Sequence, residues 1–331
     1  MSVSSPTEAI DFPDQGFIDE YSYYMTRRPS VTVVVERDVV DPLLIRNTEP
    51  DRAETIEFNG VTRAQSNPEK FVSKERLTGL DLLRQLDGGD GEIISDEYTY
   101  NEPPTLENAI NMDALTYGAT GTGDEDYGIK SRLTAGYTYT LGNYEILNAE
   151  TRNAAYESGT MKNSDGEQSQ ALYEQVRVQP DNEFVHFLTI EAGTPAMLAY
   201  VLHNVLNTYG YGARQTRSGK TIQNRIRALI LADNPVMLSV GEFIKNHDPE
   251  PNPESVGKEL SNYINAHKQA NWSVYGDGGV PDTDDFPQWF TTLKAVAGRQ
   301  RADSVDILKE MFTTDTQAAK TSEDGIPGIG N

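Results

Sequence analysis

Three stretches of the chain have the hydrophobic pattern of β-strands. The β-branched run at residues 31–36, which follows Pro29, is typical of a buried strand. Residues 183–192 (EFVHFLTIEA) and 221–233 (TIQNRIRALILAD) are similarly rich in large apolar positions. We therefore expect these three segments to form the main sheet.

The segments between these strands are more polar. Residues 41–70 are expected to form a hairpin or an excursion from the sheet. The Thr- and Tyr-rich segment 132–147 is expected to form a hairpin around Leu141-Gly142-Asn143. Residues 88–130 contain many Gly, Asp and Asn residues and the pair Pro103-Pro104, which favour loops over packed elements.

Apolar positions spaced three residues apart predict helices elsewhere. In residues 75–86, Leu77, Leu80 and Leu83 share one helical face, and the helix is expected to end at Gly88-Gly89. Further helical patterns occur towards the C-terminus, at residues 253–269, 286–298 and 304–312.

The region around Thr194 carries the clearest local signals. Thr194 is a good N-cap and Pro195 suits the first helical position, while Gly210 and Gly212 end the helix and open a loop. The order is then strand, helix, loop, strand, which is a repeated half of ferredoxin-like folds. We therefore predict an α+β protein with a modified ferredoxin-like core. Its expected regions are an acidic N-terminal arm (1–24), the core (25–240) with an irregular insertion (about 88–130), a helical C-terminal region (241–313) and a flexible tail (314–331).

The charge balance adds information about the environment. The 331 residues include 51 acidic and 28 basic side chains, which gives a net charge of −23. This surplus favours a halophilic protein, whose carboxylates are screened by concentrated salt, over an ordinary acidic protein that avoids nucleic acid. A negative net charge therefore does not exclude a nucleic-acid partner.

Composition also excludes several classes of function. The absence of cysteine rules out disulfides, thiolate metal sites and cysteine nucleophiles, and four scattered histidines do not suggest a zinc cluster. No G-x-S-x-G motif supports a serine nucleophile. No apolar run approaches the roughly 20 residues needed to span a bilayer, and the N-terminus lacks a secretory pattern, so we expect a soluble, cytoplasmic protein.

Residues 192–232 contain no acidic residue, although acids outnumber bases in the chain nearly two to one. Glycines here would let the backbone approach a phosphate closely, and arginine and tyrosine can stack on bases. The alternative is that the arginines pair with surplus carboxylates at a subunit or domain contact. Gly219-Lys220-Thr221 is not a phosphate-binding P-loop, because that motif requires glycine where Arg214 stands. The basic residues of this interval are Arg214, Arg217, Lys220, Arg225 and Arg227.

Alternation along residues 221–233 places polar and apolar side chains on opposite faces. Gln223, Arg225 and Arg227 are expected on one face. Ile222, Ile226 and Ile230 are expected on the other. An RRM-like sheet uses one exposed face for single-stranded RNA, so this polar face is a candidate RNA surface.

Four segments resemble one known family in the same order. They are KERLTGLDLLRQL (74–86), ALTYGATG (114–121), NAAYESGTM (153–161) and YVLHNVLNTYGYGARQTRSGK (200–220). The family is that of the type I-D CRISPR backbone protein, Csc-two, a Cas-seven-like subunit. The resemblance implies an RRM-like palm whose copies polymerise along a guide RNA. The implied partners are the guide RNA, target DNA or RNA, copies of itself and other type I-D subunits.

The candidate RNA-binding residues lie in two loops and one strand. In the glycine-rich loop the resemblance adds Gly210, Gly212 and Thr216 to the basic residues. The loop tyrosines and the strand arginines are candidates from their chemistry. The SGTM turn is a second RNA-facing loop by resemblance, or simply a strand connection. The full set is Tyr209, Gly210, Tyr211, Gly212, Arg214, Thr216, Arg217, Lys220, Arg225, Arg227, Ser158, Gly159, Thr160 and Met161.

Two further expectations concern metal and catalysis. Relatives often carry a cysteine cluster before the TYG stretch, but residues 100–118 here contain neither cysteine nor histidine, so we expect no metal or cofactor and an insertion held by packing alone. An alternative function is an endoribonuclease that uses Asp38 or Asp41 after the first strand. A third is a self-assembling structural protein without nucleic acid.

Overall fold

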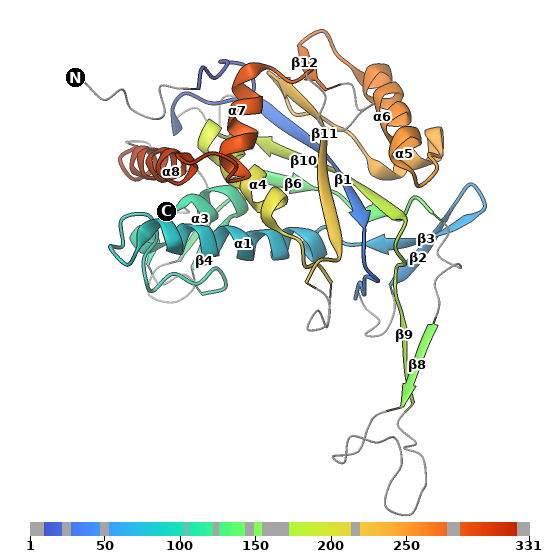
Figure 1. Cartoon of the computed structure of the whole chain (residues 1–331). Coiled ribbons are helices and arrows are strands. Elements are labelled where there is room, and N and C mark those ends of the chain that lie inside the picture. Colours follow the sequence, from blue (N-terminus) through green and yellow to red (C-terminus); the bar gives the residue numbers. More distant parts are fainter. Residues whose placement is uncertain are drawn as a thin grey trace, which may run out of the picture.

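The fold is built on a five-stranded antiparallel sheet with the strand order β12-β11-β1-β10-β6 (Figure 1). The computed structural model describes residues 10–21, 28–46, 53–102, 105–121, 126–142, 149–153, 172–212, 219–276 and 285–322. The strands of this sheet are β1 (Ser30–Val39), β6 (Leu133–Ala135), β10 (Asn182–Glu191), β11 (Ile222–Ala232) and β12 (Trp272–Tyr275).

The connections follow the ferredoxin-like pattern. β1 pairs antiparallel with both β10 and β11, so these two strands are parallel to each other and α4 (Pro195–Asn207) is the crossover between them. With α1 (Glu69–Asp87) and β6, the order β1-α1-β6-β10-α4-β11 is a βαββαβ unit. The predicted α+β, ferredoxin-like fold class is confirmed.

Local sequence signals explain the helix boundaries. The Thr194 hydroxyl accepts a hydrogen bond from the Met197 amide at 3.3 Å, and Pro195 occupies the first turn of α4, as predicted. α1 ends at Asp87, and Gly88 has a φ of +69°, the left-handed conformation that glycine adopts without strain. Both helices pack on the same face of the sheet in the main hydrophobic core. On α1, Leu80 and Leu83 are buried there as expected.

Leu77 differs from its predicted companions. Its side chain is 41% exposed, because α1 turns this position away from the sheet. It lies instead at a surface groove described below.

The opposite face of the sheet is also covered. Helices α5 (Val240–His247) and α6 (Pro253–His267) pack over it (Figure 1). A small sheet of β2 (Glu54–Phe58), β3 (Val61–Ser66) and β7 (Thr138–Tyr139) lies next to it. Strand side chains such as Val34, Phe187 and Ile230 are buried in this second core. The expectation of an open sheet face for RNA is therefore wrong for this chain.

A β-bulge changes the alternation within β11. The register with β1 shifts between Val34 and Val35, so that Ala228 pairs with Val34 and Ile226 with Val35, and Arg227 is the extra residue. One extra residue exchanges the faces of all later side chains. Ile226 therefore packs in the core below α1 and α4, whereas Ile230 packs in the core below α5 and α6. The prediction that these two isoleucines share a face is wrong.

The predicted hairpins have mixed outcomes. β2 and β3 form the hairpin expected within residues 41–70, with Asn59 and Gly60 both at positive φ. In the second predicted hairpin, β6 joins the central sheet and β7 pairs with β3, while residues 143–148 lie outside the described residues. Beyond them, β8 (Ala149–Asn153) and β9 (Leu172–Val176) pair in a ribbon that projects from the body (Figure 1).

The insertion at 88–130 contains short elements and a buried ion pair. Its elements are α2 (Leu106–Ala109), α3 (Met112–Tyr117), β4 (Ala119–Gly121) and β5 (Tyr127–Ile129). Arg76 of α1 pairs with Asp113 of α3 at 2.7 Å, and the Tyr98 hydroxyl donates to the same carboxylate at 2.7 Å. Burial, with the Asp113 carboxylate adding to it, raises the pKa of Tyr98 well above its ordinary value, so its hydroxyl keeps its proton. Packing of buried Met112 and Leu115 is thus supplemented by polar contacts.

Both described ends of the chain are better packed than expected. In the N-terminal arm Ile10, Ile18 and Tyr21 are buried. The C-terminal helices are α7 (Gln288–Ala297) and α8 (Ser304–Lys320), and α8 continues past the expected start of the tail with Ala319 buried. Tyr21 donates a hydrogen bond to Asp315 at 2.6 Å and joins the two ends. No helix among the described residues is long and apolar enough to cross a membrane.

Candidate nucleic-acid interface

The glycine-rich loop comprises residues 209–220, and hydrogen bonds hold its two described ends together. The Tyr209 carbonyl accepts hydrogen bonds from the amides of Thr221 and Ile222 at 2.9 and 3.1 Å. The Tyr211 amide donates to the Thr221 hydroxyl at 2.8 Å. Residues 213–218 lie outside the described residues, so Arg214, Thr216 and Arg217 are not placed. The loop therefore starts and ends at a fixed point beside β11.

Gly212 fits because it has no side chain. Its φ is +84°, and a Cβ atom would lie 2.7 Å from both the Leu43 Cδ1 atom and the Leu44 carbonyl oxygen. The loop thus presses directly against the segment that follows β1, an approach that only glycine allows.

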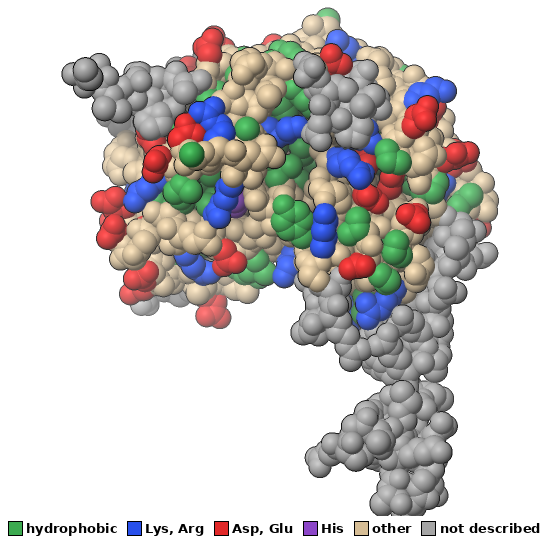
Figure 2. All heavy atoms as spheres, in the orientation of Figure 1, with side chains coloured by type: hydrophobic (Ala, Val, Ile, Leu, Met, Phe, Trp, Pro, Cys, Tyr) green, Lys and Arg blue, Asp and Glu red, His purple; other side chains and the backbone are tan. Residues whose placement is uncertain are grey.

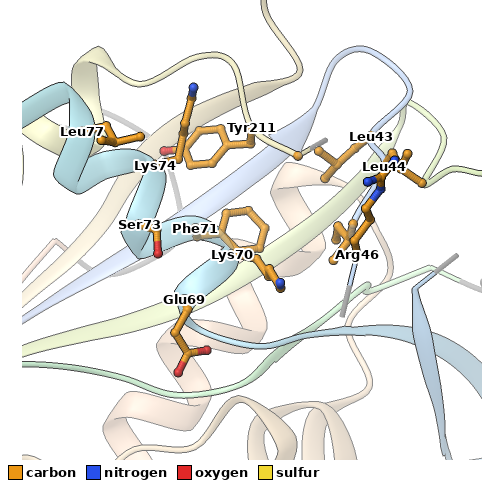
Figure 3. Close-up of a pocket in the computed structure, with 12 residues that line it drawn as sticks. Leu43, Leu44, Arg46, Glu69, Lys70, Phe71, Ser73, Lys74, Leu77 and Tyr211 are labelled. Carbon is orange, nitrogen blue, oxygen red and sulfur yellow. The ribbon is translucent and has the colours of Figure 1, made fainter. Parts of the chain in front are cut away.

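A groove of about 390 Å³ opens between this contact and the first half of α1 (Figure 3). Its floor is apolar, formed by residues such as Phe71, Leu77 and Tyr211. The basic side chains of Arg46, Lys70 and Lys74 line it together with one acid, Glu69. The full lining is Leu43, Leu44, Ile45, Arg46, Glu69, Lys70, Phe71, Ser73, Lys74, Leu77, Tyr211 and Gly212.

The sequence prediction missed this groove. Lys70 and Lys74 are four residues apart and precede Leu77 on α1, so helical spacing already placed the two cations beside an apolar position. The leucine pattern hides this signal, because it places Leu77 with Leu80 and Leu83 on the core side of the helix. Arg46 is half-buried, and its Nε atom is buried without a hydrogen-bond partner in the described structure. On the face seen in Figure 2, basic side chains occur along the middle and acidic ones are more frequent towards the rim.

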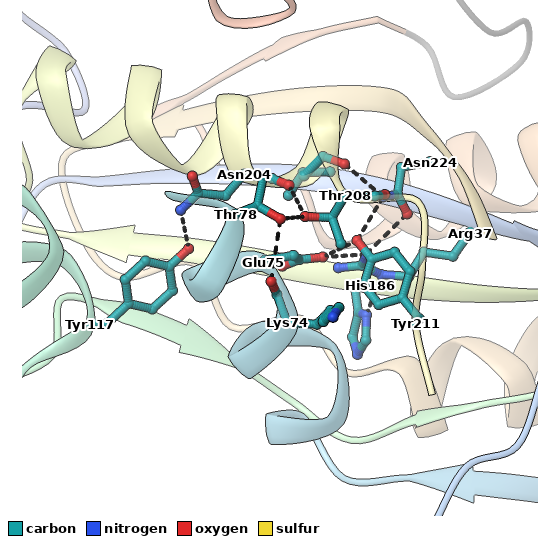
Figure 4. Close-up of polar contacts among 11 residues, drawn as sticks. Arg37, Lys74, Glu75, Thr78, Tyr117, His186, Asn204, Thr208, Tyr211 and Asn224 are labelled. Carbon is teal, nitrogen blue, oxygen red and sulfur yellow. Dashed lines mark hydrogen bonds and ion pairs between the residues drawn. The ribbon is translucent and has the colours of Figure 1, made fainter. Parts of the chain in front are cut away.

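A buried polar network fixes the loop from below (Figure 4). Arg37 of β1 pairs with Glu75 of α1 at 2.5 Å, and the Tyr211 hydroxyl donates to the same carboxylate at 2.8 Å. Asn224 donates to the Tyr211 hydroxyl at 2.8 Å and accepts from Arg37 at 3.0 Å. Burial, with the Glu75 carboxylate adding to it, raises the pKa of Tyr211 well above its ordinary value. The phenol therefore stays protonated and can donate.

His186 completes this network. The Arg37 Nε atom donates to His186 Nδ1 at 2.7 Å. Burial and the adjacent guanidinium hold the pKa of His186 well below its usual value, so the ring is neutral and its Nδ1 can accept.

Two predicted RNA contacts do not fit the structure. Tyr211 and Arg227 are each only 1% exposed. Tyr211 belongs to the buried network, and Arg227 forms an ion pair with Glu36. Both side chains support the fold and are not accessible to a strand.

Arg225 is only partly accessible. It binds Glu36 at 2.8 Å and Asp38 at 3.1 Å, and 27% of its side chain is exposed. The strand arginines thus pair with carboxylates, as the alternative expected, but on the neighbouring strand β1 and not at a subunit or domain contact. Glu183 lies opposite Asp38 on β10, and burial, together with the carboxylates of Glu36 and Asp38, raises the pKa of Glu183 to about 8.

Other predicted residues are exposed at the loop. Tyr209 is 43% exposed, and Lys220 Nζ lies 5.5 Å from the centre of its ring. Gly210 and Gly212 are accessible at the same place. The second predicted loop, Ser158, Gly159, Thr160 and Met161, lies outside the described residues.

The structure provides little for catalysis. Asp38 is engaged by Arg225, and Asp41 is exposed just beyond β1. Within the described ranges, no group of three or more His, Cys, Asp or Glu side chains could hold a metal ion. No observation therefore favours the endoribonuclease hypothesis.

Comparisons with known proteins point to one family. The model of the Csc2 Crispr family matches residues 52–275. The fold is similar to the crystal structure of Thermofilum pendens Csc2, with 16% identity, a TM-score of 0.57 and coverage of 93% of both chains. It is also similar to a chain of a CRISPR RNA-guided surveillance complex, pre-nicking, with 9% identity and a TM-score of 0.55, covering 81% of this chain and 99% of the other. No curated protein matches the sequence.

Proposed function

We propose that this chain, which belongs to the Csc2 Crispr family, is a guide-RNA-binding backbone subunit of a type I-D interference complex. Copies of the chain polymerise along the guide and hold its backbone, which leaves the bases free to pair with target DNA or RNA. The partners are the guide RNA, the target, copies of the chain and other type I-D subunits. The place of action is a salt-rich cytoplasm. Membership of a CRISPR family argues against the structural protein without nucleic acid.

The observation that carries this proposal is the position of the glycine-rich loop. The loop stems from a 41-residue stretch without acids, residues 192–232, in a chain with 51 acidic residues. It lies against a groove with an apolar floor and three basic residues to one acid. A phosphate strand is attracted to such a surface, and an acidic surface elsewhere repels it.

The chemistry of the groove suits a strand bound by its backbone. Lys70, Lys74 and Lys220 can neutralise phosphates, and the exposed main chain of Gly210 and Gly212 can approach them closely. Leu77, the exposed apolar side chain of the groove, makes no base-specific hydrogen bond and therefore tolerates any base. Binding should therefore depend little on sequence, as a backbone subunit for many guides requires.

The direct test is to purify the chain from its host and sequence the RNA that comes with it. We expect guide RNAs, with an elevated ratio of absorbance at 260 to 280 nm. Purified chain should also bind single-stranded RNA, and charge reversal of Lys70 and Lys74 to Glu should weaken binding by more than about tenfold. Reversal of Lys258 and Lys309, on α6 and α8, is the matched control. A folded groove variant that binds RNA as tightly as the control would contradict the site.

A further inference from the structure

Thr221 lies between the glycine-rich loop and β11, and it binds the main chain at the start of that loop. Its hydroxyl accepts a hydrogen bond from the Tyr211 amide at 2.8 Å. The one proton of this hydroxyl can be donated to the Tyr211 carbonyl at 3.0 Å or to the Tyr209 carbonyl at 3.3 Å. The Thr221 amide also donates to the Tyr209 carbonyl, at 2.9 Å. One residue at the far end of the loop therefore holds both tyrosines at its start.

The carbonyl of Thr221 holds the segment that follows β1. It accepts a hydrogen bond from the Val40 amide at 3.0 Å and a longer, weaker one from the Asp41 amide at 3.5 Å. This segment continues into Leu43, which lines the groove and lies against Gly212. Thr221 thus binds the loop through its hydroxyl and amide, and the wall of the groove through its carbonyl.

Burial makes the hydroxyl of Thr221 difficult to replace. The residue is 3% exposed, so water has little access to the Tyr211 amide that the hydroxyl binds. A buried donor that loses its partner costs more free energy than the hydrogen bond itself contributes. A hydroxyl also accepts from an amide and donates to a carbonyl at the same time, which an apolar side chain of the same size cannot do.

The start of the loop is therefore fixed on two sides. The Tyr211 side chain is bound by Glu75 and Asn224 (Figure 4), and its main chain is bound by Thr221. A surface that is already formed avoids the entropy cost of ordering a loop when a ligand binds. Thr221 is not one of the residues that line the groove, so its effect on a bound strand is indirect.

We propose that Thr221 is a positioning residue of the RNA surface, and that its hydroxyl holds the glycine-rich loop against the wall of the groove before RNA arrives. The residue itself makes no contact with the strand. This inference rests on the proposed function and names the group that preforms its site. Without the hydroxyl, the loop occupies its position in only a fraction of the chains, and the apparent RNA affinity falls by that fraction.

The test measures binding of a single-stranded RNA oligomer to the full chain at fixed salt. Thr221→Val replaces the hydroxyl with a methyl group and should weaken binding about fivefold, the factor that corresponds to one lost hydrogen bond. Thr221→Ser keeps the hydroxyl and should bind like wild type. Thr32→Val is the matched control, because Thr32 is buried near the other end of β1 and its hydroxyl is bonded to that of Thr189 at 2.8 Å. This variant should lose stability and keep its RNA affinity.

Binding kinetics separate positioning from direct contact. Since the hydroxyl acts on the free chain, Thr221→Val should lower the association rate constant about fivefold and leave the dissociation rate constant unchanged. Loss of a side chain that touches the strand would mainly raise the dissociation rate constant. Gly212→Ala disturbs the same contact between loop and groove wall. The double variant should therefore weaken binding by less than the product of the two single effects.

The outcomes distinguish this inference from the proposed function. A folded Thr221→Val chain that binds RNA like Thr32→Val overturns the inference and leaves the proposed function intact. The same holds if Thr221→Ser binds as weakly as Thr221→Val, or if only the dissociation rate constant changes. If Thr221→Val does not fold, Thr221→Ala removes the hydroxyl without adding a methyl group beside the Tyr211 amide and takes its place in every comparison. Wild-type chain that binds no RNA contradicts the proposed function itself.

Discussion

Arg37 and Glu75 form an ion pair of 2.5 Å in which both side chains are almost fully enclosed. The pair joins the central strand to α1, and Glu75 also accepts the hydroxyl of Tyr211. The glycine-rich loop, the floor of the groove and the sheet are therefore parts of one polar network. Changes deep in the core should be felt at the proposed RNA surface.

Removal of one partner from this pair should be costly. Glu75→Ala leaves the Arg37 guanidinium buried and uncompensated, so we expect a loss of about 3 to 5 kcal/mol in the free energy of unfolding, measured by urea titration at fixed salt. Asp81→Ala is the matched control, because its pair with Arg84 is 3.8 Å long and exposed. That change should cost less than about 1 kcal/mol. Equal effects would show that the buried pair has no special role.

Gly212 should not tolerate a side chain. In Gly212→Ala the new Cβ atom would collide with the Leu44 carbonyl oxygen. The residue would also be strained at its φ of +84°, so the loop must move away from the groove. We expect RNA affinity to fall at least about fivefold, with a loss of about 1 to 3 kcal/mol of stability. Gly136→Ala, where no atom lies within 4 Å of the added Cβ, is the control. Unchanged RNA binding by folded Gly212→Ala would separate the loop from RNA recognition.

Glu183 should make stability depend on pH. Its pKa in the folded state is about 8, against an unfolded value near 4.5. Between these two pH values the folded state retains a proton that the unfolded state has lost. The stabilisation that Glu183 contributes is therefore complete below about pH 4.5 and is lost as the pH rises to 8. Glu183→Gln mimics the protonated form. The variant should match wild type at pH 4.5 and be more stable by about 1 to 3 kcal/mol at pH 8.

Thermal unfolding at several pH values, compared between variant and wild type, measures this difference. Glu57→Gln, at an exposed position of β2, controls for the loss of one negative charge. A constant difference from pH 4.5 to 8 would show that Glu183 is ionised throughout.

The stability of the insertion at residues 88–130 should depend on Arg76 and not on a bound metal ion. Arg76→Met leaves Asp113 buried without its cation, so residues 88–130 should become sensitive to proteolysis and stability should fall by about 3 to 5 kcal/mol. Arg301→Met, at an exposed pair with Asp303, is the control. A chelator should leave the wild-type melting temperature unchanged, and elemental analysis should find no zinc. One zinc ion per chain would contradict this expectation.

Salt should act on folding and on RNA binding in opposite directions. Salt screens the carboxylates of a chain with a charge of −23 and so favours folding, while it weakens phosphate contacts. We expect the isolated subunit to unfold or aggregate at low salt and the assembled complex to keep its guide in molar potassium chloride. Stacking, main-chain bonds and contacts between copies would retain the RNA. Circular dichroism and RNA pull-down across a salt series test both parts. A chain that is folded without salt and releases RNA at moderate salt would contradict the halophilic interpretation.

Local patterns predicted the framework of this fold better than its surfaces. The three main strands and the start of α4 follow from β-branched runs and from the Thr194-Pro195 cap, signals that lie within a few residues. The ion pairs of Arg225 and Arg227 could not be read in the same way, because Glu36 is about 190 residues away in the sequence. The cover of α5 and α6 over the sheet likewise depends on long-range packing.

The bulge at Arg227 divides β11 into two parts that can vary separately. The residues before it connect the glycine-rich loop to the sheet, whereas the residues after it lie between the two cores. In the first part only Gln223 and Arg225 are partly exposed, so substitutions there would change the surface beside the loop, whereas Ile222, Asn224 and Ile226 are buried. Deletion of Arg227 would instead restore simple alternation and turn the residues on one side of it by half a revolution. The separation between the loop-side part of β11 and its fully buried part would then be lost.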